Sequence, residues 1–374
     1  MEMKFDENIY YPLGGASYVF KDNLIKYIKS KIDKGKIKIS VGSQPNSSPH
    51  FGTISVFSLA FSLAEQIKKN YEDLDISILF EVVDTAPSEK IEINGITYQK
   101  SLKSAGIIEK YIPQFIEILQ FYSKKTGISY EIRYQHEFNN LKEVKSTIRE
   151  VVSNREKIAK FIDPKYERLR VRVACPRCGL SDKNSINNEY SKDNRKLISY
   201  CPEHGRFETD IETQSYRLEY NTPLRNLIRA IVYGTINNSD EYDYQIIRIT
   251  GNDYAGFYQE ELLYKIVSLL GYPVHNLPLI IYCPLIMDWS GAKLSKTLYV
   301  KSGAYKYLPE YLINYENLIK SKGKYGLEII NKITKEWVLE PYKLFRNYSI
   351  YYFMKRFEDD EKNEKWWYLF EHKT

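Results

Sequence analysis

Three cysteines and one histidine are spaced along the sequence like the ligands of a metal ion. They form two pairs, Cys175-x2-Cys178 and Cys201-x2-His204, with 22 residues between the pairs and a glycine directly after each. Three thiolates and one imidazole complete a tetrahedral zinc shell, and a shell that protein ligands fill is structural rather than catalytic. The spacing predicts structural Zn²⁺, against the alternative of four unrelated residues in a polar insert.

Residues 45–53, Pro-Asn-Ser-Ser-Pro-His-Phe-Gly-Thr, have the composition of a phosphate-binding loop. They precede an apolar stretch long enough for a buried helix, and a helix N-terminus offers unpaired N–H groups to phosphate. His50 adds a donor there, and Gly52 lets a flat ring approach the backbone closely. The alternative is a capped turn that happens to contain a histidine.

A second loop, Gly-Ala-Lys-Leu-Ser-Lys-Thr at 291–297, holds two lysines three positions apart. Lys293 and Lys296 are able to neutralise a polyphosphate that gains charge in a transition state. The alternative is a solvated basic loop. Between the two loops, Asp253 in Thr-Gly-Asn-Asp ends an apolar run, where it is placed either to accept hydrogen bonds from ribose hydroxyls or to cap a helix.

These residues need a scaffold, and the hydrophobic periodicity predicts an α/β fold. Ile37, Ile39 and Val41 alternate with polar residues, as in a strand, and a helical stretch and a second apolar strand follow. Strand, helix and strand at this spacing predict a doubly wound parallel sheet, Rossmann-like, which an insertion interrupts. We expect strands at 36–42, 76–83, 129–135, 244–249 and 277–282, helices at 51–69, 105–125, 141–161, from 221 and near 256–270, and a helical tail after 300.

Composition limits the class of protein. The chain has 374 residues, is 43% hydrophobic and 27% charged, and carries a net charge of +6, which fits a folded protein with room for an anionic partner. Four cysteines are too few for a disulfide scaffold, no apolar run reaches a membrane span, and the N-terminus lacks a secretory pattern. We therefore expect a cytoplasmic protein. Cys283 stands alone in an apolar strand, and we expect it in the core.

The two loops together resemble the two signatures of class I aminoacyl-tRNA synthetases. His50 and Thr53 match the first signature, Lys293 and Lys296 match the second, and Gly251-Asn252-Asp253 matches the family's Gly-x-Asp. The resemblance implies that His50, Thr53, Lys293 and Lys296 are catalytic, and that ATP binds with Mg²⁺. It implies ATP contacts from Pro45, His50, Gly52, Thr53, Gly251, Asp253, Lys293, Ser295 and Lys296.

The position of the cysteine-rich insert is similar to that in class I lysyl-tRNA synthetases. The family's Asp-Trp-Pro-x-Arg-Trp helix start aligns with Pro223 and Arg225, although the flanking tryptophans are absent here. This resemblance covers residues 35–300 and implies lysine as the amino acid. Carboxylates that end the second strand would then pair with the ε-ammonium, and two tyrosines would line the pocket, unless the acids are ordinary caps. These candidates are Glu81, Asp84, Tyr220 and Tyr254.

The sequence departs from the family in the first signature and in the length of the tail, and the tail bears on the acceptor. Ser47 stands where the family has glycine, and Thr53 where it has histidine or asparagine. Only 77 residues follow Thr297, short for the large helical anticodon-binding region of the lysyl enzymes. Tail aromatics such as Trp337 and the cluster Trp366-Trp367-Tyr368 are able to stack on bases, but packing against the catalytic domain is the role we expect.

The expected function is therefore ATP-dependent activation of an amino acid and its transfer to tRNA. The alternatives are a relative that passes the amino acid to a small molecule, peptide or carrier protein, and an RNA-binding protein without catalysis. The sequence shows no heptad pattern, which favours a monomer. The expected domains are a first catalytic half at 1–169, a zinc-binding insertion at 170–215, a second catalytic half at 216–300 and a helical tail at 301–374.

Overall fold

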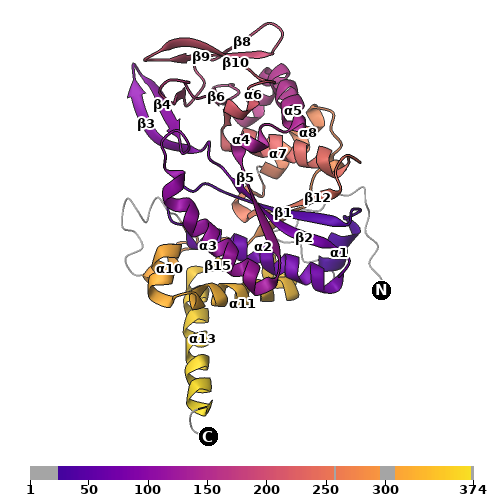
Figure 1. Ribbon diagram of the computed structural model, residues 1–374, viewed down its shortest axis with the longest axis vertical. Coiled ribbons are helices and arrows are strands. Elements are labelled where there is room, and N and C mark those ends of the chain that lie inside the picture. The colour runs from indigo at the N-terminus through magenta and orange to yellow at the C-terminus, as the bar shows by residue number, and fades with distance from the viewer. Residues whose placement is uncertain (1–23, 257, 295–307, 372–374) are drawn as a thin grey trace.

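A computed structural model of the protein describes residues 24–256, 258–294 and 308–371. Its central sheet is parallel and five-stranded in the described part of the chain (Figure 1). The strands run in the order β13 (Ile280–Cys283), β12 (Tyr244–Gly251), β1 (Lys36–Ser43), β2 (Asp75–Val82) and β5 (Ser129–Tyr134). Numbered along the chain this is 3-2-1-4-5, the order of doubly wound sheets, in which ligands bind where the order reverses. That point lies between β1 and β12.

The alternation of side chains along β1 divides the sheet into two faces. Ile39 is fully buried on one face and lies in register with Ile78 of β2 and Ile247 of β12. The side chain of Ser40 lies on the other face, where its hydroxyl is 3.2 Å from that of Tyr233. The expected strand at 36–42 and the expected parallel sheet are confirmed, and the structure shows this strand at the centre of the sheet.

Each face of the sheet is covered by helices and their apolar side chains. On the face of Ile39 pack α1 (Leu24–Ser30), α2 (Phe51–Asn70), α3 (Ile108–Thr126) and α11 (Tyr325–Leu339). On the face of Ser40 pack α5 (Lys142–Ser153), α6 (Arg155–Ile162), α7 (Thr222–Asn237) and the π-helix η4 (Tyr258–Ile266). The expected start of α7 is confirmed, because the Asn221 side chain accepts a hydrogen bond from the Leu224 N–H at 3.2 Å.

The insertion and a preceding hairpin form a separate set of small antiparallel sheets, at the upper end of Figure 1. The hairpin of β3 (Pro87–Ile93) and β4 (Ile96–Ser101) pairs with β7 (Leu180–Asp182). The other strands of this region are β6 (Val171–Val173), β8 (Glu189–Tyr190), β9 (Lys196–Cys201), β10 (Gly205–Asp210) and β11 (Leu218–Tyr220). The hairpin is not among the strands predicted from the sequence, and its residues 89–92 are exposed, so it lacks the buried apolar alternation of the central strands.

The tail is helical as expected and is part of the main hydrophobic core. Small polar side chains let α11 approach α2 closely, with the Thr334 hydroxyl 2.8 Å from that of Ser58 and 2.9 Å from that of Ser62. Trp337 is fully buried and stacks on Tyr348 at 5.3 Å between ring centroids. Trp337 is therefore part of the core and is not available for stacking on bases.

Further elements complete the description. The strand β14 (Ile286–Met287) pairs with β15 (Tyr348–Ser349). The helix α13 (Ile350–Glu371) extends away from the body of the molecule in Figure 1. The side chains of Trp366, Trp367 and Tyr368 on this helix lie outside what the structure describes. The short helices are α4 (Gln135–Phe138), α8 (Val267–Leu269), α10 (Tyr315–Lys322), α12 (Pro341–Leu344), η2 (Ser215–Arg217), η3 (Asn252–Tyr254), η5 (Val274–Asn276) and η6 (Glu310–Leu312).

Two helices differ from their sequence expectation. The charged helix expected at 141–161 is broken into α5 and α6 at Asn154, whose amide N–H bonds back to the Glu150 carbonyl. The helix expected near 256–270 is mostly the π-helix η4. Hydrophobic spacing alone does not separate an α-helix from these variants, because a one-residue change in hydrogen bonding leaves the same apolar face buried.

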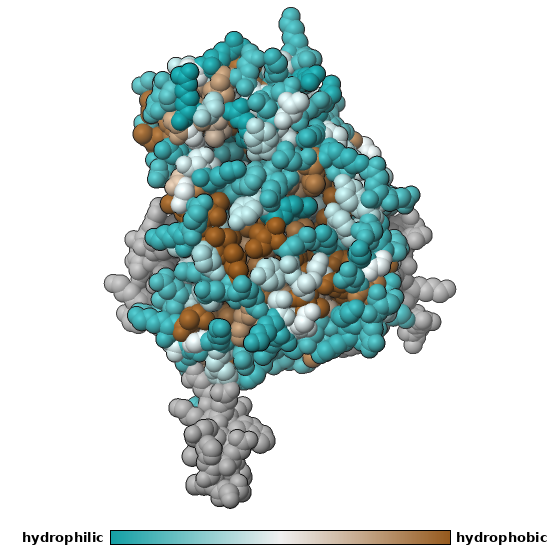
Figure 2. Space-filling view, viewed as in Figure 1, coloured by the Kyte–Doolittle hydropathy of each residue, from teal (hydrophilic) through white to brown (hydrophobic). Residues whose placement is uncertain are grey.

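The surface matches the composition. On the face shown in Figure 2, hydrophilic side chains dominate the upper and lower parts, and apolar residues show between them. No helix in the described ranges is both long and apolar enough to cross a membrane. The expected cytoplasmic location and the expected domain boundaries stay predictions.

The buried indole of Trp337 generates a test of how the tail is held. Replacing Trp337 with alanine is expected to lower the free energy of unfolding by about 3–5 kcal/mol, because the substitution leaves a large cavity in the core. Chemical denaturation measures the change. Leu339→Ala on the same helix is the control, since Leu339 is 63% exposed. Equal effects of the two substitutions would contradict the docking of α11.

Candidate functional site

A cavity of about 840 Å³ opens at the carboxyl ends of β1 and β12, where the strand order reverses. Its volume is in the range of cofactor and substrate sites. It is lined by the loop after β1, the start of α2, the end of β12, the first half of α7, the segment from 284 to 294 and the segment from 308 to 316. Segments far apart in the sequence therefore meet at the point that the topology favours for ligands.

The N-terminus of α2 faces this cavity, and His50 is its capping residue. The His50 Nδ1 accepts from the Thr53 N–H at 3.3 Å, and its Nε2 lies 3.0 Å from the Thr53 hydroxyl. A Cβ at Gly52 would lie 3.1 Å from His50 Cε1, so glycine lets the imidazole fold over the helix start. The Phe51 N–H donates to the Ile313 carbonyl and the Thr53 N–H donates to His50, so this helix start offers the cavity chiefly the positive end of its dipole, which suits an anion.

Asp253 and Lys293 meet at the same cavity from two different segments. The Lys293 Nζ lies 2.5 Å from the Asp253 Oδ2, and both residues line the cavity. Gly251 is required beside them, because a Cβ there would collide with the Asp253 Oδ1. This ion pair is partly exposed and adds little stability, so its main effect is to hold both side chains at the cavity.

A tight turn before Lys293 sets its position. The Asp288 Oδ1 accepts from the Ser290 N–H at 2.9 Å and from the Ala292 N–H at 3.2 Å, and Gly291 adopts the left-handed φ of 80° that glycine favours. An antiparallel bridge then pairs Lys293 with Met287. Ser295 and Lys296 lie outside the described residues.

The structure brings most of the expected nucleotide residues together. Those that line the cavity are His50, Gly52, Thr53, Gly251, Asp253 and Lys293, with Tyr254 beside them. Pro45 is buried next to the loop and does not line the cavity. The segment at 308–316 closes the loop from outside, as the Tyr315 N–H donates to the Pro49 carbonyl at 2.7 Å.

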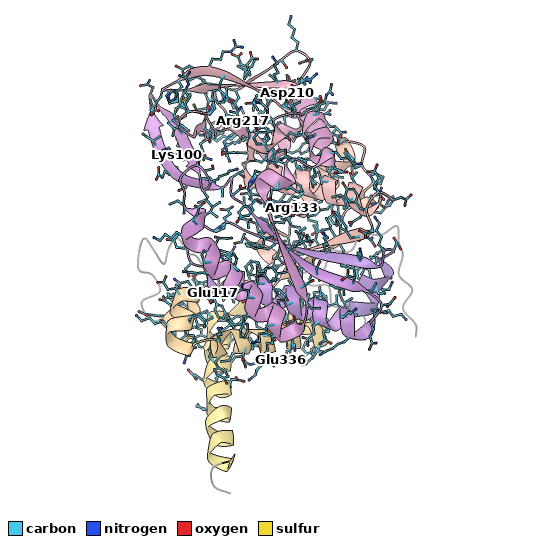
Figure 3. All side chains as sticks on the ribbon, viewed as in Figure 1. Lys100, Glu117, Arg133, Asp210, Arg217 and Glu336 are labelled. Carbon is cyan, nitrogen blue, oxygen red and sulfur yellow. The ribbon has the colours of Figure 1, made fainter. Side chains whose placement is uncertain are left out.

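Glu81, expected to receive a lysine side chain, is fully buried and does not line the cavity. Its carboxylate accepts from the Tyr233 hydroxyl at 2.6 Å and is ion-paired with Arg133 and Arg229. Burial alone would raise the pKa of Glu81, but the two guanidinium groups outweigh it and hold this pKa below its usual range. Figure 3 labels Arg133 where β5 ends below α4.

Asp84 and Tyr220 are also buried away from the cavity lining. Asp84 is 1% exposed and bonds to His136 Nδ1. Tyr220 is 1% exposed in the core under α7, and burial raises the pKa of its phenol. The expected amino-acid pocket therefore keeps Tyr254 alone of its four candidates on the cavity surface.

Three arginines line the cavity that the sequence analysis did not assign to it. Arg225 and Arg229 come from α7, and Arg248 comes from β12. Arg225 appeared in the sequence analysis only as part of a family motif. The sequence does contain a pattern that could have indicated these arginines as functional residues. Two of them stand four positions apart on an otherwise apolar helix, and the third interrupts an apolar strand.

The four proposed zinc ligands converge in the insertion. Their candidate ligand atoms all lie within 4.8 Å of one another, with the Cys178 and Cys201 sulfurs 3.5 Å apart. The His204 Nδ1 lies 3.6 Å from the Cys175 sulfur. Tetrahedral zinc with bonds of about 2.0–2.3 Å sets its ligand atoms roughly 3.3–3.8 Å apart, so the cluster fits the ion.

The surroundings of this cluster suit a structural metal. Gly179 and Gly205, which follow the two pairs, have φ values of 78° and 74°, as tight knuckles require. None of the four ligands is among the described residues that line the cavity. The expected core position of Cys283 is confirmed, since this free cysteine is 1% exposed in β13.

The fold and the cavity thus define an α/β protein with a doubly wound parallel sheet and a cavity lined by basic side chains at its switch point. No protein-family model and no curated protein matches the chain. Similar solved structures include a presumed arginyl-tRNA synthetase of Campylobacter jejuni, with 12% identity, a TM-score of 0.33, and 85% of this chain and 69% of that chain covered.

Two further similar structures come from Elizabethkingia. A glutamate-tRNA synthetase of Elizabethkingia anophelis shows 12% identity and a TM-score of 0.32, over 72% of this chain and 54% of that one. A glutamate tRNA ligase of Elizabethkingia meningosepticum, in complex with its amino acid, shows 13% identity and a TM-score of 0.30, over 72% and 53%. The chain spans about half the length of these two proteins.

The ligand cluster generates a test by metal analysis. The purified chain is expected to carry one Zn²⁺, and Cys178→Ser is expected to lose most of it and to melt at a lower temperature. Elemental analysis and thermal denaturation measure both effects. Cys283→Ala is the matched control and should keep its zinc, because Cys283 lies in the central sheet. A Cys178→Ser protein with full zinc content would exclude this site.

Proposed function

We propose that the protein activates an amino acid with ATP, as class I aminoacyl-tRNA synthetases do. The observation that carries the proposal is the meeting of His50, Asp253 and Lys293 at one cavity. They come from segments separated by about 40 to 200 residues. The sheet order places all of them where doubly wound folds bind nucleotides, and the sequence motifs that include them resemble the signatures of that class.

In this proposal the nucleotide lies across the switch point. The positive end of the α2 dipole and the side chains of His50 and Thr53 face the phosphates. Asp253 accepts hydrogen bonds from the ribose hydroxyls, and Lys293 turns from Asp253 toward the phosphates as they enter. Mg²⁺ accompanies the triphosphate in the usual way and supplies further charge neutralisation.

The reaction itself requires little acid–base chemistry. A carboxylate oxygen of the amino acid attacks the α-phosphorus, the bond from that phosphorus to the bridging oxygen of pyrophosphate breaks, and pyrophosphate leaves with the electron pair. Catalysis comes from positioning and from charge stabilisation on the leaving group. Lys293 stabilises the charge on the leaving pyrophosphate, together with Lys296. The role of Lys296 rests on the sequence motif alone.

The acceptor of the activated amino acid is tRNA in the class that the motifs resemble, and we propose tRNA here. Zinc in the insertion stabilises that region and takes no part in the chemistry. Lysine is the amino acid that the sequence resemblance favours. Among the described residues that line the cavity, Asp253 and Glu316 carry carboxylates, and Asp253 is already paired with Lys293. The charge of the cavity is therefore a better guide to the amino acid than the resemblance.

ATP–pyrophosphate exchange, run over the amino acids one at a time, tests the proposed activation. Exchange with at least one amino acid is expected, and His50→Ala and Lys293→Met should each lower its rate by about 10²–10³-fold, since each removes a contact to developing charge. Lys355→Met is the control, because Lys355 pairs with Asp359 on the exposed surface of α13. An unchanged rate in Lys293→Met would overturn the assignment of this lysine.

Exchange, combined with assays of tRNA charging and of RNA binding, separates the alternatives. Exchange without transfer to any tRNA would favour a small-molecule, peptide or carrier-protein acceptor. Absence of exchange with every amino acid, in a protein that binds RNA, would favour a binding protein over an enzyme.

A further inference from the structure

The part of the cavity next to α7 is unusually rich in buried positive charge. Arg225 is 6% exposed and Arg229 is 3% exposed, and Arg248 is partly buried beside them. All three line the cavity. A buried charge costs several kcal/mol unless an opposite charge and hydrogen bonds compensate it, so the partners of these arginines are informative.

Carboxylates of the protein neutralise only part of the positive charge of these arginines. Glu81 is shared between Arg133 and Arg229, the latter at 3.6 Å. Arg225 donates to the Thr222 hydroxyl at 3.3 Å, and Arg248 donates to the Asn226 side chain. Within the described ranges neither Arg225 nor Arg248 has a carboxylate in ion-pair range, so both have only neutral partners.

The electrostatics agree with this geometry. Burial, and then the neighbouring charge of Arg229, lower the pKa of Arg225 to about 9. The same two causes, in the same order, lower the pKa of Arg248. An anion placed between the two guanidinium groups would reverse both effects, because it would supply the missing opposite charge.

This basic region is separate from the residues proposed for the nucleotide. It belongs to α7 and to the side chains of the sheet that face α7, whereas His50 caps α2 on the opposite face of the sheet. A Cβ at Gly42, the residue near the end of β1, would lie 3.2 Å from Arg229 Nη1, so the glycine leaves room for the guanidinium beside the strand end. Cations thus flank the cavity on two sides.

We propose that the amino acid activated in this cavity carries a carboxylate side chain, as glutamate and aspartate do, and that Arg225 and Arg248 bind it. The inference rests on the proposed function. The α-carboxylate must reach the α-phosphorus near His50 and Lys293, so it is not the group that neutralises the arginines. We assign that role to a second carboxylate, on the side chain of the amino acid. Arginine binds carboxylates through two parallel hydrogen bonds. A lysine side chain would bring a third cation to the same place.

The test compares acidic amino acids with their amides, which have the same shape without the charge. Titration calorimetry with glutamate, glutamine, aspartate, asparagine and lysine measures binding directly, in the presence of a non-hydrolysable ATP analogue. We expect glutamate over glutamine, or aspartate over asparagine, by roughly 10- to 100-fold, the range of a hydrogen-bonded charge. Equal affinity for acid and amide in both pairs, or tighter binding of lysine, would overturn the inference.

Substitutions locate the effect. Arg225→Gln should remove most of the preference for the acid over its amide, and Arg225→Lys should keep a part of it, since an ammonium lacks the planar fork of a guanidinium. Arg149→Gln is the control, because Arg149 is an exposed arginine that pairs with Glu212 away from the cavity. A full preference retained in a folded Arg225→Gln protein would overturn the role of Arg225. If Arg225→Gln does not fold, Arg225→Lys and the comparison in the unaltered protein decide.

The two proposals fail in different ways. Pyrophosphate exchange that depends on lysine or on a neutral amino acid supports activation and overturns the acidic side chain. Binding of glutamate or aspartate that depends on Arg225, with no exchange, supports the acidic side chain and contradicts activation.

Discussion

The pairing of β1 with β12 is the contact on which the rest of the structure depends. These strands are about 200 residues apart in the chain, yet they lie side by side in register, with Ile39 opposite Ile247. Because both are parallel, their carboxyl ends meet at one edge of the sheet, and so do the loops that follow them. The N-terminus of α2, with His50, comes to face Asp253 only through this pairing. Apolar packing on both faces holds the pairing in place, since a slip of one residue would exchange the isoleucines on one face with the polar Ser40 and Arg248 on the other.

The positive charges of the cavity form two groups. They differ in whether a carboxylate of the protein neutralises them. Lys293 is partly exposed and paired with Asp253, so its charge is easily exchanged between partners. Arg225 is buried without a carboxylate, so its charge is expensive and specific. A partly exposed, screened cation suits the proposed neutralisation of a leaving polyphosphate. A fixed, desolvated cation suits recognition, because it penalises every ligand that fails to supply the matching anion.

The regions far from the cavity explain how the site is kept rigid. Buried hydroxyl groups between α2 and α11 let the tail pack directly on the helix whose N-terminus lines the cavity, and Trp337 fills the core beside it. At the other end, apolar side chains of the insertion, Val171, Leu197 and Ile211 among them, join the hydrophobic cluster under α7. The four clustered ligands of the insertion have the composition of a zinc shell, and such a shell adds folding energy when the metal binds.

The sequence by itself determined the local features. The alternation around Ile39 fixed a strand, Asn221 with Pro223 fixed the start of a helix, and the cysteine spacing fixed the composition of the metal cluster, because each of these depends on residues close together in the chain. It also indicated His50, Asp253 and Lys293, through motifs of a few residues. Only the tertiary structure decided which charges remain uncompensated. Glu81 and Arg225 are both charged residues in otherwise apolar segments, yet Glu81 is ion-paired with Arg133 and Arg229, whereas Arg225 lines the cavity without a carboxylate partner among the described residues. Their fates depend on partners far along the chain, and side-chain periodicity carries no information about such partners.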